Sequence, residues 1–226
     1  MTQLTQAVEG RLKVAEALAN GEYGGGYVEA CLIISGVFSG LAADVWPGRS
    51  IDQMRFVELW VQHTDATLRP NLIALPLLIY ALGRDGKTAE AEQLVKATPG
   101  KFGGGYASLV LTGDDVDMPV ANVQQIVPTV DLKYLRKYTY GSVFYRHVRS
   151  AATHEYELGT RATGMPMTER DVGISYSNRL DADTMQSRRL IHYHIPWLLD
   201  LVRSAATAVE SLPLPQQRPG KWWVEG

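Results

Sequence analysis

Apolar residues recur at steps of three and four along much of the chain, which is the spacing of one face of an α-helix. The first such stripe runs from Leu4 to Leu18 and stops at Asn20 and Gly21, residues that commonly end helices. The stretch from Tyr27 to Trp46 is almost wholly apolar or small. A helix of that composition is expected at the centre of the fold, with neighbours on most of its sides.

The rest of the chain is also predicted to be mainly helical. We expect a helix that starts near Ser50 or Asp52, a buried helix from Asp65 to Leu82, a short amphipathic helix from Thr88 to Ala97, a helix from about Asp131 to about Leu158 with a break at Gly141, and a long helix from Ser187 to Leu212 that Pro196 kinks. Residues Val172 to Ser177 alternate like a strand. The pattern predicts a mainly α fold, a helical bundle with irregular or small β-hairpin insertions, as one domain over residues 1–226 with a tail at 213–226.

Composition narrows the class of protein. The chain has 226 residues, 46% hydrophobic and 20% charged, and its formal net charge of −2 disfavours a protein that coats nucleic acid through bulk positive charge. The single cysteine, Cys31, excludes a disulfide framework. No signal peptide is evident at the N-terminus, and the apolar runs 30–43 and 72–82 are expected to be too short to span a bilayer. We therefore expect a soluble, cytoplasmic protein.

Several familiar catalytic motifs are absent from the sequence, among them the phosphate-binding loop, the dinucleotide-binding loop, the paired-histidine zinc motif and the serine nucleophile elbow. His192 and His194 stand two apart, and would share a face if that segment were extended, but no third metal ligand is evident. An unrelated enzyme that uses these histidines and the irregular stretches 99–130 and 160–183 is one alternative. We expect no metal and no cofactor.

The segment from Lys133 to Tyr156 combines basic and aromatic residues. Between Asp131 and Glu155 it holds five basic residues and no acidic one, interleaved with four tyrosines. These are Lys133, Arg136, Lys137, Arg146 and Arg149, with Tyr134, Tyr138, Tyr140 and Tyr145. Basic groups beside aromatic rings are typical of surfaces that bind RNA. The alternative is a solvated helix face with half-buried tyrosines.

Within this segment, Arg149 and His154 fit the pattern Arg-x4-His, which Tyr156 extends to Arg-x4-His-x-Tyr. This pattern resembles the signature of the HEPN superfamily, all-helical domains that include many metal-independent ribonucleases. Residues 144–148, just before the motif, and the stretches 42–48 and 55–58 are similar in their residue types to members of that family. Many catalytic members carry Asn, Asp or His where this chain has Ser150. The resemblance covers about residues 27–160 and the last helix, and leaves 99–130 and 160–183 as insertions.

The chemistry of such a site follows from the side chains. Metal-free RNA cleavage needs a group with a pKa near 7 to move protons and a cation on the crowded phosphate, so His154 is the expected general acid or base and Arg149 the expected phosphate ligand. The products would be a 2′,3′-cyclic phosphate and a 5′-OH. Tyr145, Arg146, His147, Ser150 and Tyr156 are candidates for substrate-binding or regulatory residues.

Helix geometry adds a constraint on these two residues. Five positions on an unbroken helix are about 500°, so Arg149 and His154 diverge by roughly 140°. Either a helix start or kink lies between them, or a two-fold dimer sets two motifs across one cleft. The resemblance implies the dimer, and implies a toxin–antitoxin or phage-defence setting. In some HEPN toxins a nucleotidyltransferase antitoxin adds AMP to the tyrosine of the motif, which makes Tyr156 a candidate target. The alternative is a non-catalytic HEPN-like binding or dimerisation module.

Overall fold

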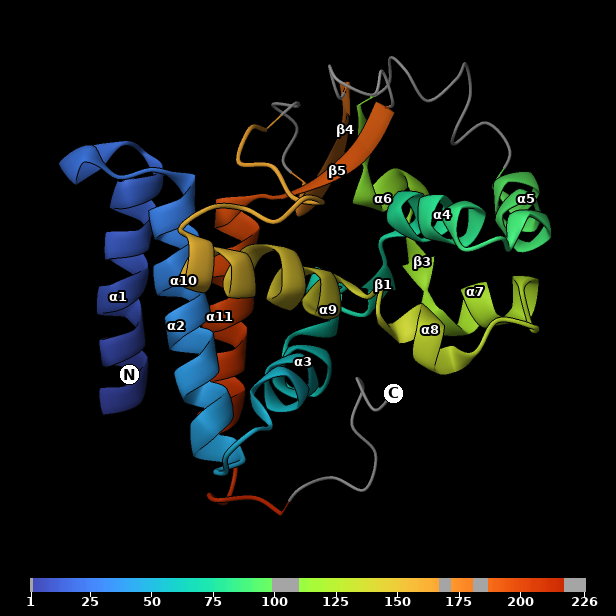
Figure 1. Ribbon diagram of the computed structural model, residues 1–226. Helices are drawn as coiled ribbons and strands as arrows, with labels where there is room; N and C mark the ends of the chain where they lie inside the picture. The colour runs from blue at the N-terminus through green and yellow to red at the C-terminus, as the bar shows by residue number, and fades with distance from the viewer. Residues whose placement is uncertain (1, 99–109, 167–171, 181–186, 218–226) are drawn as a thin grey trace.

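The computed structural model of the protein describes residues 2–98, 110–166, 172–180 and 187–217. Helices dominate this part of the chain, and the strands are short and antiparallel, so the expected mainly α fold with small β insertions is confirmed. Figure 1 shows a helical bundle at one end, a cluster of shorter helices at the other, and a β-hairpin above the junction between them.

Three long helices form the body of the bundle: α1 (Gln3–Ala19), α2 (Tyr27–Val45) and α11 (Ile195–Glu210). They pack on one another, and α3 (Asp52–Gln62) crosses beside α2. The expected stripe of α1 is buried at its centre, with Val8, Leu12 and Ala15 inward. These side chains join the apolar residues of α2 and α11 in one continuous core, so the burial of a shared apolar face is what holds the bundle together.

One further rod of helix crosses the bundle. It consists of α9 (Tyr140–Phe144), a π-helical segment (Tyr145–Ser150) and α10 (Ala151–Glu155). Gly141 lies against the indole of Trp60 on α3, and a Cβ at this position would come within 2.9 Å of the ring. The glycine therefore permits this close approach rather than breaking the helix.

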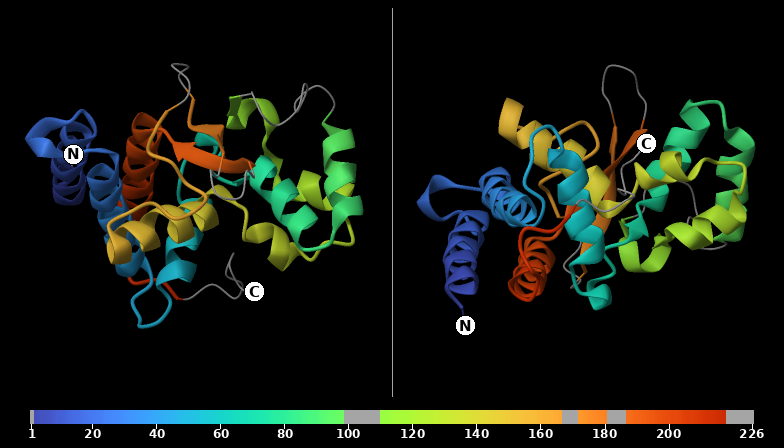
Figure 2. Two further views of the ribbon diagram at one scale, coloured as in Figure 1. Left: turned by 45° about the horizontal axis from the view of Figure 1, so that its top comes forward. Right: turned by 90° about the horizontal axis from the view of Figure 1, so that it is seen from below.

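A second, smaller core lies at the other end of the molecule. It is enclosed by α4 (Leu75–Arg84), α5 (Thr88–Ala97), α7 (Val120–Ile126) and α8 (Leu132–Arg136). Figure 2 shows these helices grouped apart from the bundle, with the orange strands between the two groups. The expected helix over Thr88–Ala97 is confirmed at both ends.

Short strands join the two cores. β1 (Leu72–Ile73) pairs with β3 (Met118–Pro119), and β2 (Leu111–Thr112) pairs with β4 (Ile174–Leu180), which pairs in turn with β5 (Ser187–Tyr193). A one-turn helix, α6 (Gly113–Val116), connects β2 to β3. The strand expected near 172–177 is therefore confirmed as the central strand of the larger sheet.

Three expected helix boundaries are wrong, and proline explains two of them. The segment 65–82 turns at Ala66–Leu68, forms β1 and becomes helical only from Leu75, with Pro76 in the first turn of α4. Residues 187–193 form β5, and α11 starts at Ile195 with Pro196 in its first turn. Proline suits the first turn of a helix because its missing N–H would have no partner there. The break expected at Gly141 falls instead at 137–139, where Thr139 bridges to β1.

The helix α2 extends beyond the apolar run 30–43 at both ends. By length and composition alone its 19 residues are enough to cross a membrane, which corrects the expectation that both runs are too short. Its place between α1, α3 and α11 is that of a core helix. Cys31 is fully buried there. After α11 the chain turns back, and the Gln216 N–H donates to the Val45 carbonyl at the end of α2.

Candidate functional site

The predicted motif lies on the rod that crosses the bundle. Tyr145 to Ser150 form a π-helix, a wider coil that often occurs at functional sites, and α10 follows without a break because Ser150 and Ala151 keep right-handed helical dihedrals. The loop after α10 returns to this coil, where the Gly159 N–H donates to the His147 carbonyl at 2.7 Å. The irregular coil is therefore fixed by a contact from outside the helix.

Arg149 is held in place by aromatic rings. Its guanidinium carbon lies 4.9 Å from the centre of the Tyr145 ring, which is cation–π distance. The Tyr145 ring in turn meets the buried Phe56 of α3 edge-on, with 5.3 Å between ring centres. This stack connects the cation to the core of the bundle, so Arg149 is presented in a defined position at the surface.

His154 and Ser150 occupy the following turns. The His154 side chain is exposed on α10, and Ser150, half-buried, is the last residue of the π-helix. Both members of the Arg149–His154 pair lie within the described chain, and no hydrogen bond joins them. Because the backbone between them is helical throughout, the expected divergence around the helix axis holds within one chain.

Tyr156 ends the helix in an unusual conformation. Its φ of +56° is left-handed, which stops α10 and turns the ring outward, with 62% of the residue exposed. The hydroxyl donates to Glu29 Oε1 at 2.8 Å, on the first turn of α2. The Glu29 carboxylate raises the pKa of Tyr156 through this bond. Glu29 was not anticipated, because nothing in the local sequence links it to a residue so far along the chain.

Arg146 and His147 face away from this surface, into a different cavity. We call it the basic pocket; its volume is about 190 Å³, and the basic residues and the histidine that line it are Arg84, Lys137, Arg146, Arg161 and His147. Burial, reinforced by Arg146 and Arg161, lowers the pKa of His147 to about 4. The structure therefore splits the predicted basic segment between two sites: Arg149 and His154 in one, Lys137, Arg146 and His147 in the other.

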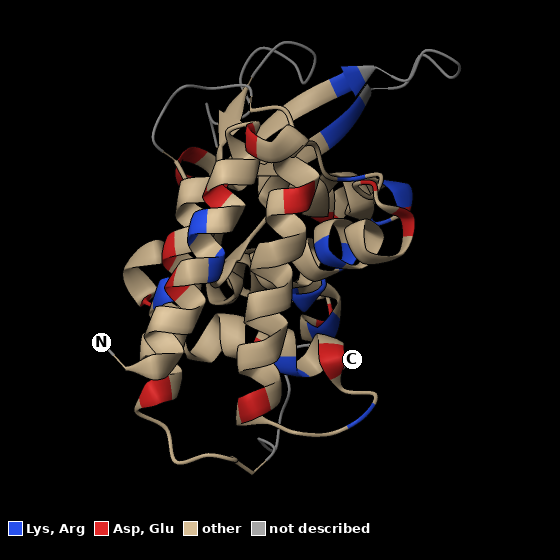
Figure 3. Ribbon diagram, turned by 90° about the vertical axis from the view of Figure 1, so that its left-hand side faces the viewer, with Lys and Arg blue, Asp and Glu red and all other residues tan. Residues whose placement is uncertain are grey.

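The tyrosines of the segment are mostly engaged inside the protein. Tyr140 is 3% exposed, and the Tyr134 hydroxyl donates to Asp85 Oδ2 at 2.7 Å. A buried ring such as that of Tyr140 cannot stack on RNA bases, so residues 133–156 do not present all four tyrosines on one surface. Figure 3, viewed from the side on which α1 lies, shows acidic and basic positions interspersed over the bundle.

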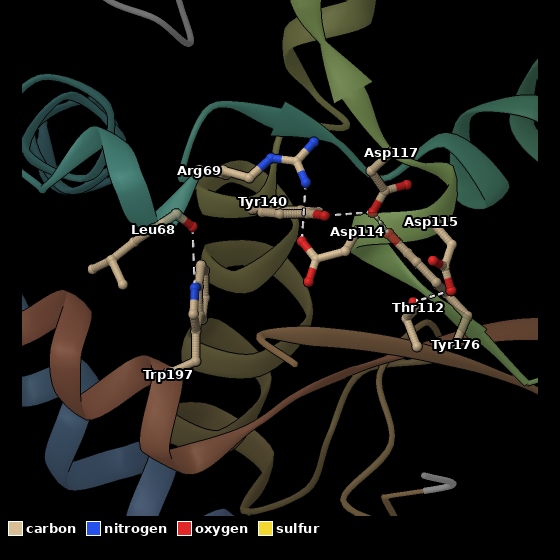
Figure 4. Close-up of polar contacts among 9 residues, drawn as sticks. All are labelled: Leu68, Arg69, Thr112, Asp114, Asp115, Asp117, Tyr140, Tyr176 and Trp197. Carbon is tan, nitrogen blue, oxygen red and sulfur yellow. Dashed lines mark hydrogen bonds and ion pairs between the residues drawn. The ribbon is translucent and has the colours of Figure 1, made fainter. Parts of the chain in front are cut away.

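A buried acid that the sequence did not single out joins the two cores. Asp117 is 4% exposed, and its Oδ2 accepts hydrogen bonds of 2.5 Å from the hydroxyls of Tyr140 and Tyr176. Its Oδ1 accepts from the Leu75 N–H at 2.8 Å, at the start of α4. Figure 4 shows the Asp117 carboxylate beside the side chains of Tyr140 and Tyr176. Burial raises the pKa of Asp117 to about 7, against the opposing effect of its donors.

A cavity of about 250 Å³ lies beside this network, lined in part by Tyr140 and Trp197. Its charged groups already have partners: Arg69 Nη1 lies 3.0 Å from Asp114 Oδ1. Trp197 Nε1 donates to the Leu68 carbonyl at 3.1 Å (Figure 4). We therefore regard this region as structural.

The histidine pair at the end of β5 also has internal partners. The rings of His192 and His194 meet at 4.7 Å, His192 Nδ1 lies 2.9 Å from the Thr163 carbonyl oxygen, and His194 Nε2 lies 3.0 Å from Ser175 Oγ. Burial lowers the pKa of His192 to about 4. Among the residues that the structure describes, no group of three potential metal ligands comes together.

Comparison with known proteins finds no relative of this chain. No protein-family model, no curated protein and no solved structure matches the chain. The case for a function therefore rests on the residues of the motif and on their geometry.

Proposed function

We propose that this protein is a metal-independent endoribonuclease of the HEPN type that works as a homodimer. The observation that carries the proposal is the pairing of a positioned guanidinium, Arg149 on the Tyr145 ring, with the exposed imidazole of His154 on the next part of the same helix. One supplies permanent charge for a phosphate, and the other supplies an imidazole that can accept or donate a proton.

The reaction would be an attack of the ribose 2′-OH on the adjacent phosphorus. His154 would take the 2′-OH proton or give a proton to the departing 5′-oxygen, and Arg149 would bind the phosphate oxygens as negative charge builds on them. The P–O5′ bond breaks as the new P–O2′ bond forms, which leaves a 2′,3′-cyclic phosphate and a 5′-OH. Ser150, next to Arg149, would orient the phosphate through its hydroxyl.

A dimer reconciles this chemistry with the helix geometry. Because Arg149 and His154 diverge within one chain, a two-fold axis near α10 would bring Arg149 of one chain to His154 of the second. Exposed apolar side chains near the start of α2 favour a contact there: Tyr23 precedes α2, Tyr156 bonds to Glu29, and Met165 follows Gly164, which packs on Tyr27. Such exposed groups commonly mark protein interfaces.

Tyr156 would also be the point of control. Its exposed hydroxyl is the group to which a nucleotidyltransferase-type antitoxin would add AMP, in a toxin–antitoxin or phage-defence system. The added group would break the bond to Glu29 and place a charged phosphate at the proposed dimer contact. The alternative function is a non-catalytic binding or dimerisation module, in which the same surface only binds a partner.

The test is cleavage of RNA by purified protein in EDTA, with analysis of the product ends. Wild type should yield cyclic phosphate and 5′-OH termini, and His154→Ala and Arg149→Ala should each lower the rate by about 10²-fold or more. Arg49→Ala is the matched control, because Arg49 is an exposed arginine between α2 and α3, away from α10. Wild type without activity, or a His154→Ala variant as active as wild type, would leave the binding module as the function.

A further inference from the structure

The basic pocket brings together cations from four separate parts of the chain. Arg84 comes from the end of α4, Lys137 from the link between α8 and α9, Arg146 from the π-helix and Arg161 from the loop before β4. Among the described residues no acidic side chain lines it. Like charges that converge on one cavity make its electrostatic potential positive, so the cavity attracts an anion.

Arg161 is fixed in this pocket before any ligand arrives. Its carbonyl accepts from the Ile191 N–H of β5 at 2.8 Å, which anchors the backbone to the sheet. Its guanidinium carbon lies 4.2 Å from the centre of the Tyr80 ring, on α4. A side chain held at both ends loses little freedom on binding, which favours a specific ligand over a diffuse ion cloud.

The guanidinium of Arg161 is also incompletely satisfied. Its Nη1 atom is buried and has no hydrogen-bond partner. A buried cationic donor without an acceptor is costly, and native proteins usually supply one from a ligand, an ion or water. This observation is independent of the count of charges and points to the same missing group, an acceptor that carries negative charge.

The remaining polar groups suit a phosphate. Arg84 uses Nε to hold Asp85 at 2.8 Å, which leaves both terminal nitrogens of its fork for another acceptor. Lys137 and Arg146 are exposed at the edge, and Thr160 also lines the cavity. A volume of about 190 Å³ equals roughly six water molecules. One phosphate group and its nearest atoms fit this space, and a folded nucleic acid does not.

We propose that the basic pocket is a binding site for a terminal phosphate monoester, held by Arg161 and Arg84 and neutralised by Lys137 and Arg146. A monoester is favoured over a diester because it carries up to two charges and can enter a small pocket by its phosphate end alone. The monoester can be a free nucleotide or the 5′-phosphate of an RNA strand. The pocket lies between the two cores, so an occupant would link α4 to the motif helix.

The experiment measures binding of inorganic phosphate, AMP and two short 2′-O-methyl oligoribonucleotides that differ only in a 5′-phosphate. These oligonucleotides lack the 2′-OH, so cleavage cannot interfere. Calorimetric titration and thermal unfolding are run against sodium chloride at equal ionic strength. Arg161→Gln should weaken phosphate binding by about ten- to a hundredfold, and Lys137→Gln by a smaller factor.

Lys133→Gln is the matched control, because Lys133 is an exposed lysine one helical turn before Lys137 and does not line the pocket. It should bind phosphate like wild type. Preference for the 5′-phosphorylated strand over AMP would identify an RNA end as the source, and preference for AMP over that strand would identify a free nucleotide. Phosphate that binds no better than chloride, or binds all three variants alike, would overturn the proposal.

This test is separate from that of the ribonuclease. Phosphate binding without RNA cleavage would support the proposed phosphate site and contradict the proposed ribonuclease activity. RNA cleavage without phosphate binding would support the ribonuclease and contradict the phosphate site. Lys137 is exposed, so its variant tests the pocket even if Arg161→Gln does not fold.

Discussion

Asp117 and Arg161 are both charged side chains placed where the two cores meet, and they differ in what surrounds them. Two tyrosine hydroxyls and a backbone N–H converge on Asp117, so every oxygen of the carboxylate has a donor. Arg161 meets an aromatic face and other cations, and one of its buried nitrogens has no acceptor. A buried charged group that has all its hydrogen-bond partners within the protein serves the structure. A buried charged group that lacks such a partner points to a ligand.

The largest effect on the free energy of unfolding should come from removing the Asp117 carboxylate. Asp117→Ala leaves three buried donors without an acceptor, from Tyr140, Tyr176 and Leu75, and should lower the free energy of unfolding by about 3 kcal/mol or more. Chemical denaturation measures this loss. A change below about 1 kcal/mol would show that the Asp117 network does not hold the two cores together.

The contribution of Asp117 to stability should also depend on pH. The folded-state pKa of Asp117 is about 7 against an ordinary value of 3.8, so its contribution to stability is complete below about pH 4 and is lost as the pH rises to about 7. At about 1.4 kcal/mol per pKa unit, the loss approaches about 4 kcal/mol. His147 and His192 act in the opposite sense, since their lowered pKa values cost stability as the pH falls from 6.5 toward 4.

A difference measurement isolates the contribution of Asp117. The unfolding free energies of wild type and Asp117→Asn are compared between pH 4 and 8, where the two histidines contribute equally to both proteins. The difference should move in favour of the variant as the pH rises, and a constant difference would contradict the raised pKa.

A smaller effect is expected where the loop meets the π-helix. A Cβ at position 159 would lie 3.0 Å from His147 Cα and 3.1 Å from its Nδ1. Gly159→Ala should therefore lower stability by about 1–3 kcal/mol, because the neighbouring atoms are backbone and a half-buried ring. The same variant should weaken phosphate binding, since His147 lines the basic pocket. Gly36→Ala is the control, with nothing within 4 Å of the added carbon.

The smallest effect should come from Arg161 itself in the absence of phosphate. Arg161→Gln loses the contact with Tyr80 but also relieves repulsion among the cations, so stability should change by no more than about 1 kcal/mol. Adding phosphate should stabilise wild type more than the variant at the same phosphate concentration. If Arg161→Gln greatly lowers stability without phosphate, Arg161 serves to hold the fold together, as Asp117 does, and not to bind a ligand.

The sequence predicts the elements whose signals are local. The helix at 88–97 and the apolar helix that starts at Tyr27 emerge with the expected bounds, because periodicity and end signals agree there. The helix predicted over 187–193 is wrong, because this segment forms β5 by pairing with β4. Pairing of this kind is a long-range interaction that local pattern does not encode.

The residues of the candidate sites also differ in whether local sequence reveals them. Arg149, His154 and Tyr156 lie in one short stretch and can be found from their spacing. Glu29 and Asp117 acquire their roles only when distant elements fold onto them, through Tyr156 and Tyr176. The only local hint of Asp117 is a carboxylate between apolar residues, which a sequence cannot distinguish from an ordinary surface acid.

The most direct test of the proposed two-chain site is complementation between inactive variants. Arg149→Ala and His154→Ala proteins are mixed, unfolded and refolded together, and RNA cleavage is measured in EDTA. If Arg149 of one chain works with His154 of the second, half of the dimers are mixed and each carries one intact site, so about a quarter of the wild-type activity should return. No recovery from mixed dimers, with the wild type active after the same treatment, would contradict a site shared between two chains.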